Sequence, residues 1–348
     1  MSQFISGLKI SKQFYEELVV PILEQNFSGL VYSAALIGPG SEVLGFDTER
    51  SVDHDWRPRV FVFLSSEDFQ NQGEQVEQIL REKLTQKFLG YPTSIEINND
   101  IRSRFVYSVQ NFAQEYLGLD DKGEKMENVD WLTFHEHCLL AFTSGEIFHN
   151  GLKELTNLRA QLAYYPNDVW LYLMASEWKK ISQEQPFIGR TGDVGDDIGS
   201  RLITARIIQS IMRFCFYSEK TYIPYSKWFG TAFNNLGCAT MLKPLIEKVF
   251  VADNWKERES ALAPIFETVV GLHNKLGITK PVDTKMNNFR DRPYLVIGAD
   301  EIVAKLQEAI RDERLKTLPL IGSINQISES VDFADEVKLR EKAKQLYR

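Results

Sequence analysis

The stretch LIGPGSEVLGFDTERSVDHDW, residues 36–56, places a glycine-rich turn shortly before two aspartates. The apolar run 32–37 predicts a buried strand that ends at Gly-Pro-Gly-Ser, and residues 41–45 suggest a short helix after it. Glycine lets a backbone approach a ligand closely, and amide groups at a helix N-terminus favour phosphate. The Ser41 hydroxyl adds one more hydrogen-bond donor. We therefore predict that Gly40 and Ser41 bind phosphate.

Asp53 and Asp55 form the second feature of this stretch. On an extended strand, residues two apart point to the same face, so the two carboxylates would project together, with His54 opposite. Neighbouring carboxylates repel unless a cation lies between them. Mg²⁺ binds one or two carboxylates and completes its shell with water and substrate phosphate. Two such ions can serve an in-line displacement at phosphorus.

Glu96 is the candidate for a third carboxylate of this site. It lies in TSIEIN, residues 93–98, whose alternation predicts another strand. Its neighbours Ile95 and Ile97 would point into the core. Glu96 is therefore predicted to bind metal or to accept the proton of an attacking hydroxyl.

The first third of the chain alternates helix and strand signals. A helix is predicted over 11–27, with Ser11 as its N-cap and a kink at Pro21. A strand over 60–64 and a helix over 74–89 follow. After a polar loop at 119–130, helical periodicity dominates. The prediction is an α+β fold, with a mixed-sheet domain over 1–120 and a helical domain over 121–348. Helices are predicted there over 132–142, 168–183, 196–217, 242–251, 255–276 and 300–315.

Composition fits a soluble, cytoplasmic protein of two domains. The chain has 348 residues, of which 43% are hydrophobic and 25% charged. Its net charge of −8 weighs against nucleic acid as a partner. The three cysteines show no CxxC spacing, which indicates free thiols in a reducing compartment. We recognise neither a signal peptide nor an apolar stretch long enough to span a membrane. The oligomeric state is left open.

Gly-Ser, eleven intervening residues, Asp-x-Asp and a later strand carboxylate together resemble the nucleotidyltransferase superfamily of polymerase-β-like folds. The stretch is most similar to the nucleotidyltransferases that adenylylate aminoglycosides. The resemblance implies triphosphate binding by Gly40 and Ser41 and Mg²⁺ binding by Asp53 and Asp55. Less directly, it implies that Glu96 is the third carboxylate or general base. His54 departs from the usual aliphatic residue, and Pro58 removes a strand hydrogen-bond donor.

Three later motifs resemble an uncharacterised bacterial family that pairs a nucleotidyltransferase-like N-terminal domain with a helical domain of unknown function. They are YYPNDVW (164–170), EWKKISQEQPFIGRTGDVGDDIGSR (177–201) and YIPYSKWFGTAF (222–233). This second resemblance covers most of the chain. It suggests a family but no substrate.

Several charged residues have two interpretations. Arg57 and Arg59 either bind phosphate bidentately or form a salt bridge at the strand edge. Tyr225 and Lys227 either reach the nucleotide phosphates from the helical domain or are solvated.

The acidic stretch 189–201 has two interpretations as well. Asp196 or Asp197 either caps the following helix or contacts a cationic acceptor. Arg190 either binds phosphate or pairs with one of these aspartates.

The function predicted from these residues is Mg²⁺-dependent transfer of a nucleoside monophosphate from an NTP, ATP by preference, to a hydroxyl group, with release of pyrophosphate. The acceptor would be a small hydroxylated molecule or a protein side chain, and an RNA end is disfavoured by the acidic charge. A non-catalytic nucleotide-binding protein with the same fold is the alternative. A phosphohydrolase that uses the same carboxylates is a third class.

Overall fold

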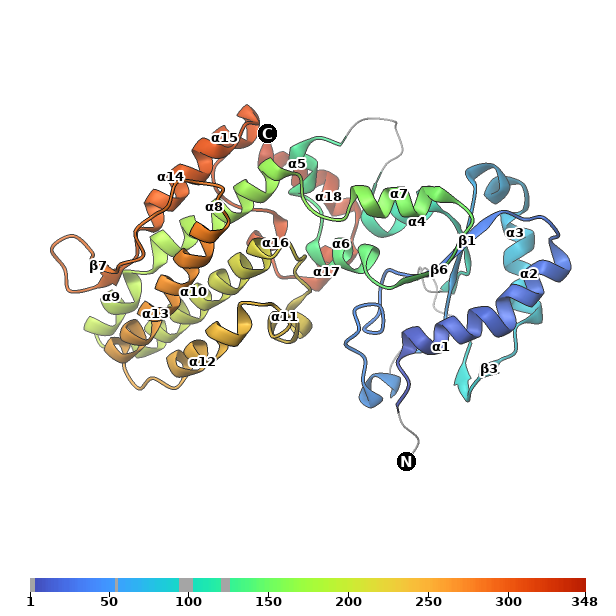
Figure 1. Cartoon of the computed structure of the whole chain (residues 1–348), viewed down its shortest axis with the longest axis horizontal. Coiled ribbons are helices and arrows are strands. Elements are labelled where there is room, and N and C mark those ends of the chain that lie inside the picture. Colours follow the sequence, from blue (N-terminus) through green and yellow to red (C-terminus); the bar gives the residue numbers. More distant parts are fainter. Residues whose placement is uncertain (1–3, 54–55, 94–102, 120–125) are drawn as a thin grey trace. The chain divides into compact units, whose positions relative to one another are not determined.

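The computed structural model describes residues 4–53, 56–93, 103–119 and 126–348. The chain forms two compact units, each built from segments that are not contiguous in sequence. The first contains residues 1–125, 134–163 and 331–342, and the second contains 126–133, 164–330 and 343–348. This division differs from the single boundary predicted at residue 120, because the chain after that point returns to the first unit twice (Figure 1).

The first unit contains a sheet, the helices that cover it and a small hairpin. Its elements are α1 (Gly7–Phe14), π-helical η1 (Tyr15–Val19), α2 (Val20–Asn26), β1 (Tyr32–Leu36), 3₁₀-helical η2 (Glu49–Asp53), β2 (Phe61–Leu64), α3 (Ser66–Lys83), β3 (Lys87–Phe88), β4 (Tyr91–Pro92), β5 (Val106–Ser108), α4 (Val109–Leu117), α6 (Glu136–Thr143), β6 (Glu146–Asn150), α7 (Lys153–Gln161) and α17 (Val331–Asp335). Helix α18 (Lys338–Ala343) ends at the boundary with the second unit.

The sheet of the first unit is mixed, in the order β5-β2-β1-β6. Strand β1 pairs antiparallel with β2 and β6, whereas β2 pairs parallel with β5. The α+β class predicted from the sequence is confirmed. Strands β5 and β6 were not predicted, because β5 has only three residues and half-exposed β6 lacks an apolar alternation.

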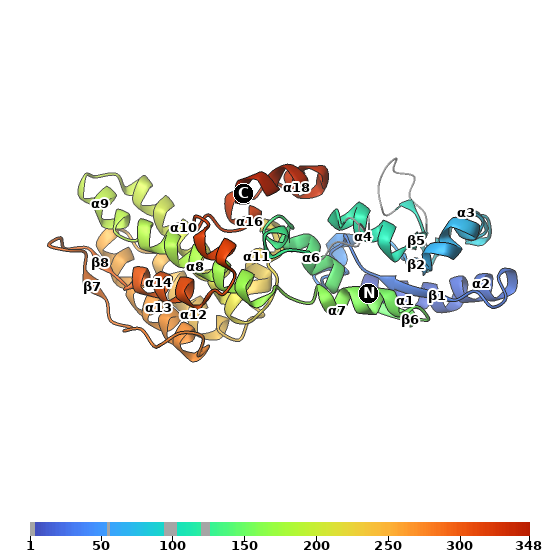
Figure 2. The same cartoon turned by 90° about the horizontal axis from the view of Figure 1, so that it is seen from above.

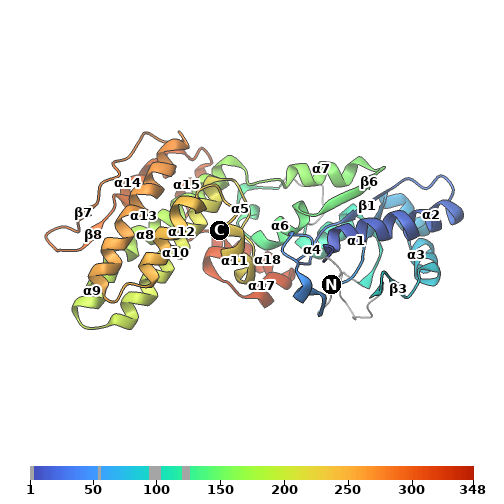
Figure 3. The ribbon, with the colours of Figure 1, turned by 60° about the horizontal axis from the view of Figure 1, so that its bottom comes forward.

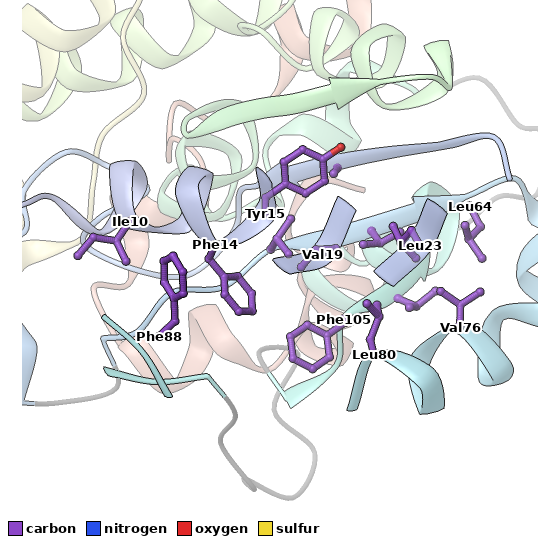
Figure 4. Close-up of a cluster of buried hydrophobic side chains, with 14 of the residues drawn as sticks. Ile10, Phe14, Tyr15, Val19, Leu23, Leu64, Val76, Leu80, Phe88 and Phe105 are labelled. Atoms are coloured by element: carbon purple, nitrogen blue, oxygen red, sulfur yellow. The ribbon is translucent and has the colours of Figure 1, made fainter. Parts of the chain in front are cut away.

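Each face of this sheet buries its own set of side chains. Ala34, Val62 and Leu64 lie on the face that packs against α1, α2 and α3 (Figure 4). On the other face, Phe61 and Phe63 contact Phe112 of α4, with ring centroids 4.9 and 5.4 Å apart. Both faces are therefore covered, which explains why the strand sequence FVFL is continuously apolar.

The first helix continues from Gly7 to Asn26 through a π-helical turn (Figure 3). It begins before the predicted Ser11, which is buried within α1 instead of capping it. Proline cannot donate to the carbonyl four residues earlier and clashes with it. The π turn, Tyr15–Val19, ends just before Pro21 and includes Glu17, the residue that carries that carbonyl. The predicted distortion at Pro21 thus takes the form of a widened turn.

The second unit is helical apart from one short hairpin, β7 (Asn287–Asn288) and β8 (Leu295–Val296). Helix α8 packs between α10 and α14 (Figure 2). The helices are α5 (Asn128–Trp131), α8 (Asn167–Glu184), α9 (Phe187–Asp193), α10 (Asp197–Ser218), α11 (Ser226–Phe233), α12 (Ala239–Phe250), α13 (Trp255–Lys275), α14 (Ala299–Ala309), α15 (Glu313–Thr317), α16 (Ile324–Ile327) and 3₁₀-helical η4 (Lys344–Tyr347). Among the described helices, none is both long and apolar enough to cross a bilayer.

Helix ends in the second unit follow local capping chemistry. Asp196 caps α10 by accepting a hydrogen bond from the Gly199 amide at 2.8 Å. This is the capping interpretation of the acidic stretch. The predicted helix 300–315 is instead two helices, because Asp312 starts α15 as a new N-cap.

Gly145 allows a close approach between the start of β6 and the end of β1. Its φ is +72°, and a Cβ there would overlap the Leu36 carbonyl. We predict that Gly145→Ala lowers the free energy of unfolding by roughly 3 kcal/mol, because strain and overlap add. Gly29→Ala is the control, since Gly29 has φ +84° but nothing within 4 Å of its Cβ position. It should cost about 1 kcal/mol. Equal losses in urea denaturation would contradict the steric contribution.

We predict that His273 of α13 makes the second unit sensitive to acid. It is fully buried, with its ring 6.2 Å from that of Trp178. Burial, with a smaller contribution from Lys305, lowers the pKa of His273 to about 4. Because the unfolded chain binds this proton near pH 6.5, stability should fall as pH drops from 6.5 to 4, by about 3 kcal/mol in total.

The measurement is urea denaturation of wild type and His273→Gln across this pH range. The variant should lose less stability than wild type on acidification. Parallel profiles for the two proteins would show that His273 is not the group responsible.

Candidate functional site

The antiparallel pairing of β1 and β2 brings the glycine-rich turn and the segment before β2 to the same end of the two strands. Ala35 of β1 lies opposite Phe61 of β2 in the antiparallel register. Gly40 and Ser41, which follow β1, therefore lie at the same end of the sheet as Arg57 and Arg59, which precede β2. This is the site to which the sequence assigned phosphate binding.

The turn after β1 depends on glycine at two positions. Gly38 has φ +80° and Gly40 has φ +140°. A Cβ on Gly40 would overlap the Arg59 guanidinium and lie 2.6 Å from the Glu42 carboxylate. Residues 41–45 form turns, closed by a 2.9 Å bond from the Phe46 amide to the Ser41 carbonyl, and not the predicted short helix. Anion binding here would therefore use individual amide groups without a helix dipole.

Several hydrogen-bond donors of this turn are unpaired within the described residues. Within the described part of the chain, the amide groups of Gly40, Ser41 and Glu42 and the Ser41 hydroxyl have no hydrogen-bond partner. The buried Nη1 of Arg59 also lacks one there. Unpaired donors gathered in one turn are the kind of groups that bind an anion, so the chemistry of this donor set fits a phosphate group.

Arg59 and Glu42 form a buried ion pair directly beside the turn. Nη2 of Arg59 lies 2.6 Å from Oε1 of Glu42, and their side chains are 3% and 4% exposed. Nε of Arg59 lies 3.2 Å from the same oxygen, and Nη2 also donates to the Pro39 carbonyl. The salt-bridge interpretation of Arg59 thus describes this structure. A phosphate contact by Arg59 stays a prediction.

The segment around Arg57 is anchored by further buried polar contacts. Arg57 is 2% exposed and donates from Nη1 to the Thr93 carbonyl at 3.0 Å. Asp47 accepts from the Gly7 amide at 2.6 Å and from Nε1 of Trp56 at 3.0 Å. The bonds of Asp47 hold Asp47 and Trp56, which flank Asp53 and Asp55 in the sequence.

The predicted carboxylates lie largely outside the described residues. Asp53 is the last residue of η2 and does not lie on an extended strand as predicted, so the same-face inference from strand geometry does not hold at Asp53. Asp55, His54 and Glu96 are outside the residues that the structure describes. Across the described ranges, no group of three or more His, Cys, Asp or Glu side chains is placed to hold a metal. Metal binding by Asp53, Asp55 and Glu96 stays a prediction.

The remaining predicted ligands belong to the second unit. Arg190 is exposed in α9, with its guanidinium carbon 5.6 Å from the Phe187 ring centroid. Tyr225 is half-buried at the N-terminus of α11, and exposed Lys227 has its Nζ 5.0 Å from the Trp228 ring centroid. Nothing in these positions identifies a phosphate ligand.

The acidic stretch 189–201 is not a loop. It forms most of α9 and the first turns of α10. Asp197 pairs with Arg201 and with buried Arg258, and these bonds hold its pKa below the usual value for aspartate. Asp197 thus stabilises the helix start instead of projecting toward a ligand.

Glu42 and Asp47 make buried or half-buried contacts near the turn that the sequence did not predict. Both flank the turn and both are held by groups distant in sequence. Glu42 directly follows the Gly-Ser pair, but its pairing with Arg59 depends on the register of β1 and β2, which the sequence spacing does not reveal.

Comparisons with known proteins give one family and one solved structure. Residues 131–229 match the family described as "Domain of unknown function (DUF4037)", which is less than half of the chain. The comparison with curated proteins gives no match. The chain is similar to the crystal structure of a nucleotidyltransferase-like protein from Exiguobacterium sibiricum 255-15, with 11% identity and a TM-score of 0.32, covering 87% of this chain and 89% of that one.

A double-mutant cycle tests the buried pair. Arg59→Met or Glu42→Gln alone should lower the free energy of unfolding by about 3–5 kcal/mol, because each leaves a buried partner uncompensated. The double variant should lose clearly less than the sum of the two. The control is the Lys12–Glu146 pair, whose side chains are 45% and 39% exposed. Its coupling should stay below about 1 kcal/mol. Additive losses at positions 42 and 59 would refute the coupling.

Proposed function

We propose that this protein is a Mg²⁺-dependent nucleotidyltransferase. It would move a nucleoside monophosphate from an NTP, by preference ATP, to a hydroxyl of a small acceptor or a protein side chain. The supporting observation is the turn at Gly40 and Ser41, which follows the interior strand β1 and carries backbone N–H groups that are unpaired within the described residues. After eleven intervening residues, the sequence carries Asp53 and Asp55.

The residues would divide the work as follows. Gly40 and Ser41 hold the β- and γ-phosphates through amide and hydroxyl donors. Asp53, Asp55 and Glu96 would hold Mg²⁺, an assignment that rests on the sequence pattern. When bound, the metal neutralises charge on the triphosphate and the leaving pyrophosphate. Arg57, Arg190, Tyr225 and Lys227 remain predicted nucleotide contacts.

The chemical step is a displacement at the α-phosphorus. The acceptor hydroxyl forms the new phosphorus–oxygen bond, and the bond to the β-phosphate oxygen breaks. Glu96 is the proposed base for the hydroxyl proton. The products are the nucleotidylated acceptor and pyrophosphate.

A non-catalytic nucleotide-binding protein is the second candidate. Two observations favour it: Asp53 ends a 3₁₀ helix, and Glu42 already neutralises the charge of Arg59. In that case the turn would still bind phosphate, without metal-dependent turnover.

Titration of ATP with and without Mg²⁺, followed by a pyrophosphate assay with a panel of hydroxylated acceptors, separates the candidates. For a transferase, Mg²⁺ should tighten ATP binding, and Asp53→Asn and Asp55→Asn should reduce pyrophosphate release to background. Glu49→Gln is the matched control, because Glu49 is an exposed acid in the same 3₁₀ helix. It should retain wild-type release.

Each other outcome has a distinct meaning. ATP binding without pyrophosphate release across the panel supports the non-catalytic protein. Release of orthophosphate or nucleoside monophosphate without a modified acceptor indicates a phosphohydrolase. Absence of any ATP binding rejects both candidates.

A further inference from the structure

The peptide between Pro39 and Gly40 has a defined orientation. It is trans, so its carbonyl and its N–H point in opposite directions. The Pro39 carbonyl accepts a hydrogen bond from Nη2 of Arg59. The Gly40 N–H therefore points away from the guanidinium.

Arg59 is itself held on several sides. Its backbone N–H donates to Oγ of Ser11 in α1 at 3.1 Å. Its Nε and Nη2 both bond to Oε1 of Glu42, at 3.2 and 2.6 Å. The planar guanidinium, fixed by more than one bond, presents Nη2 to the Pro39 carbonyl in a defined direction.

The burial of Arg59 argues for a role other than direct contact with a phosphate. The Arg59 side chain is 3% exposed and its charge is compensated by Glu42. A side chain with so little exposed surface and a neutralised charge is poorly placed for direct contact with a ligand in solvent. Glycine at position 40 permits this close approach, because a Cβ there would overlap the Arg59 guanidinium.

We propose that Arg59 is a positioning residue that fixes the Pro39–Gly40 peptide plane, so that the Gly40 amide faces an incoming phosphate. The phosphate in this inference rests on the proposed function. The orientation of the peptide does not, and the two parts can be tested separately.

The first test needs no ligand. Crystal structures of wild type, Arg59→Lys and Arg59→Met would show the direction of the Pro39 carbonyl. In Arg59→Met the carbonyl should leave its inward orientation, and in Arg59→Lys, which keeps one charged donor, it should be retained. An unchanged peptide plane in Arg59→Met overturns the positioning role. If Arg59→Met does not fold, Arg59→Ala with Glu42→Gln, which removes both buried charges, replaces it.

The second test uses inorganic tripolyphosphate as the probe in isothermal titration calorimetry. Arg59→Met should weaken binding at least tenfold, with Arg59→Lys closer to wild type. Leu80→Ala is the stability control, because Leu80 is fully buried in α3 of the same unit and away from the turn. It should bind as wild type does. Equal affinity for Arg59→Met and wild type overturns the link to phosphate.

Failure of the proposed function and failure of the positioning role of Arg59 give different results. If wild type binds neither tripolyphosphate nor ATP, the proposed function fails, and the crystal structures still decide whether Arg59 sets the peptide plane. If wild type binds and Leu80→Ala loses affinity as Arg59→Met does, general destabilisation explains the loss and the positioning role is rejected.

Discussion

The buried ion pair between Arg59 and Glu42 is the interaction on which the site region depends. It joins the segment before β2, the turn after β1 and, through Ser11, the first helix. A charged pair removed from water is stable only with good geometry and additional hydrogen bonds. Here the Pro39 carbonyl accepts such a bond from the guanidinium, and Ser11 holds the backbone amide of Arg59. The conformation of the glycine turn is therefore set by side chains from other elements as much as by its own sequence.

The strongly periodic parts of the fold were predictable from sequence. Helices α8, α10 and α13 lie within one or two residues of the predicted bounds, because long apolar faces mark them and Asp196 also caps α10. The short strands β5 and β6 were not, since tertiary pairing defines them more than local pattern. The early start of the first helix was missed because Ser11, a good cap residue, is buried for its bond to the Arg59 amide.

Only the locally encoded part of the candidate site was predictable from sequence. A glycine-serine turn after a strand is a local signal, and in the structure this turn follows the end of β1. The partner of Arg59 could not be read from spacing, because a salt bridge between residues 42 and 59 requires the register of β1 and β2. The strand geometry assumed for Asp53 failed because residues 49–53 form a 3₁₀ helix, which has no apolar period to reveal it.

The return of the chain to the first unit has a consequence for how the protein is made. Strand β1 has β2 on one side and β6 on the other, and β6 lies at residues 146–150, well after the other three strands. During synthesis from the N-terminus, β1 therefore carries an open edge with unpaired backbone groups until residue 150 has left the ribosome. A fragment that stops at residue 120 keeps that edge permanently, and it should self-associate instead of behaving as an independent domain.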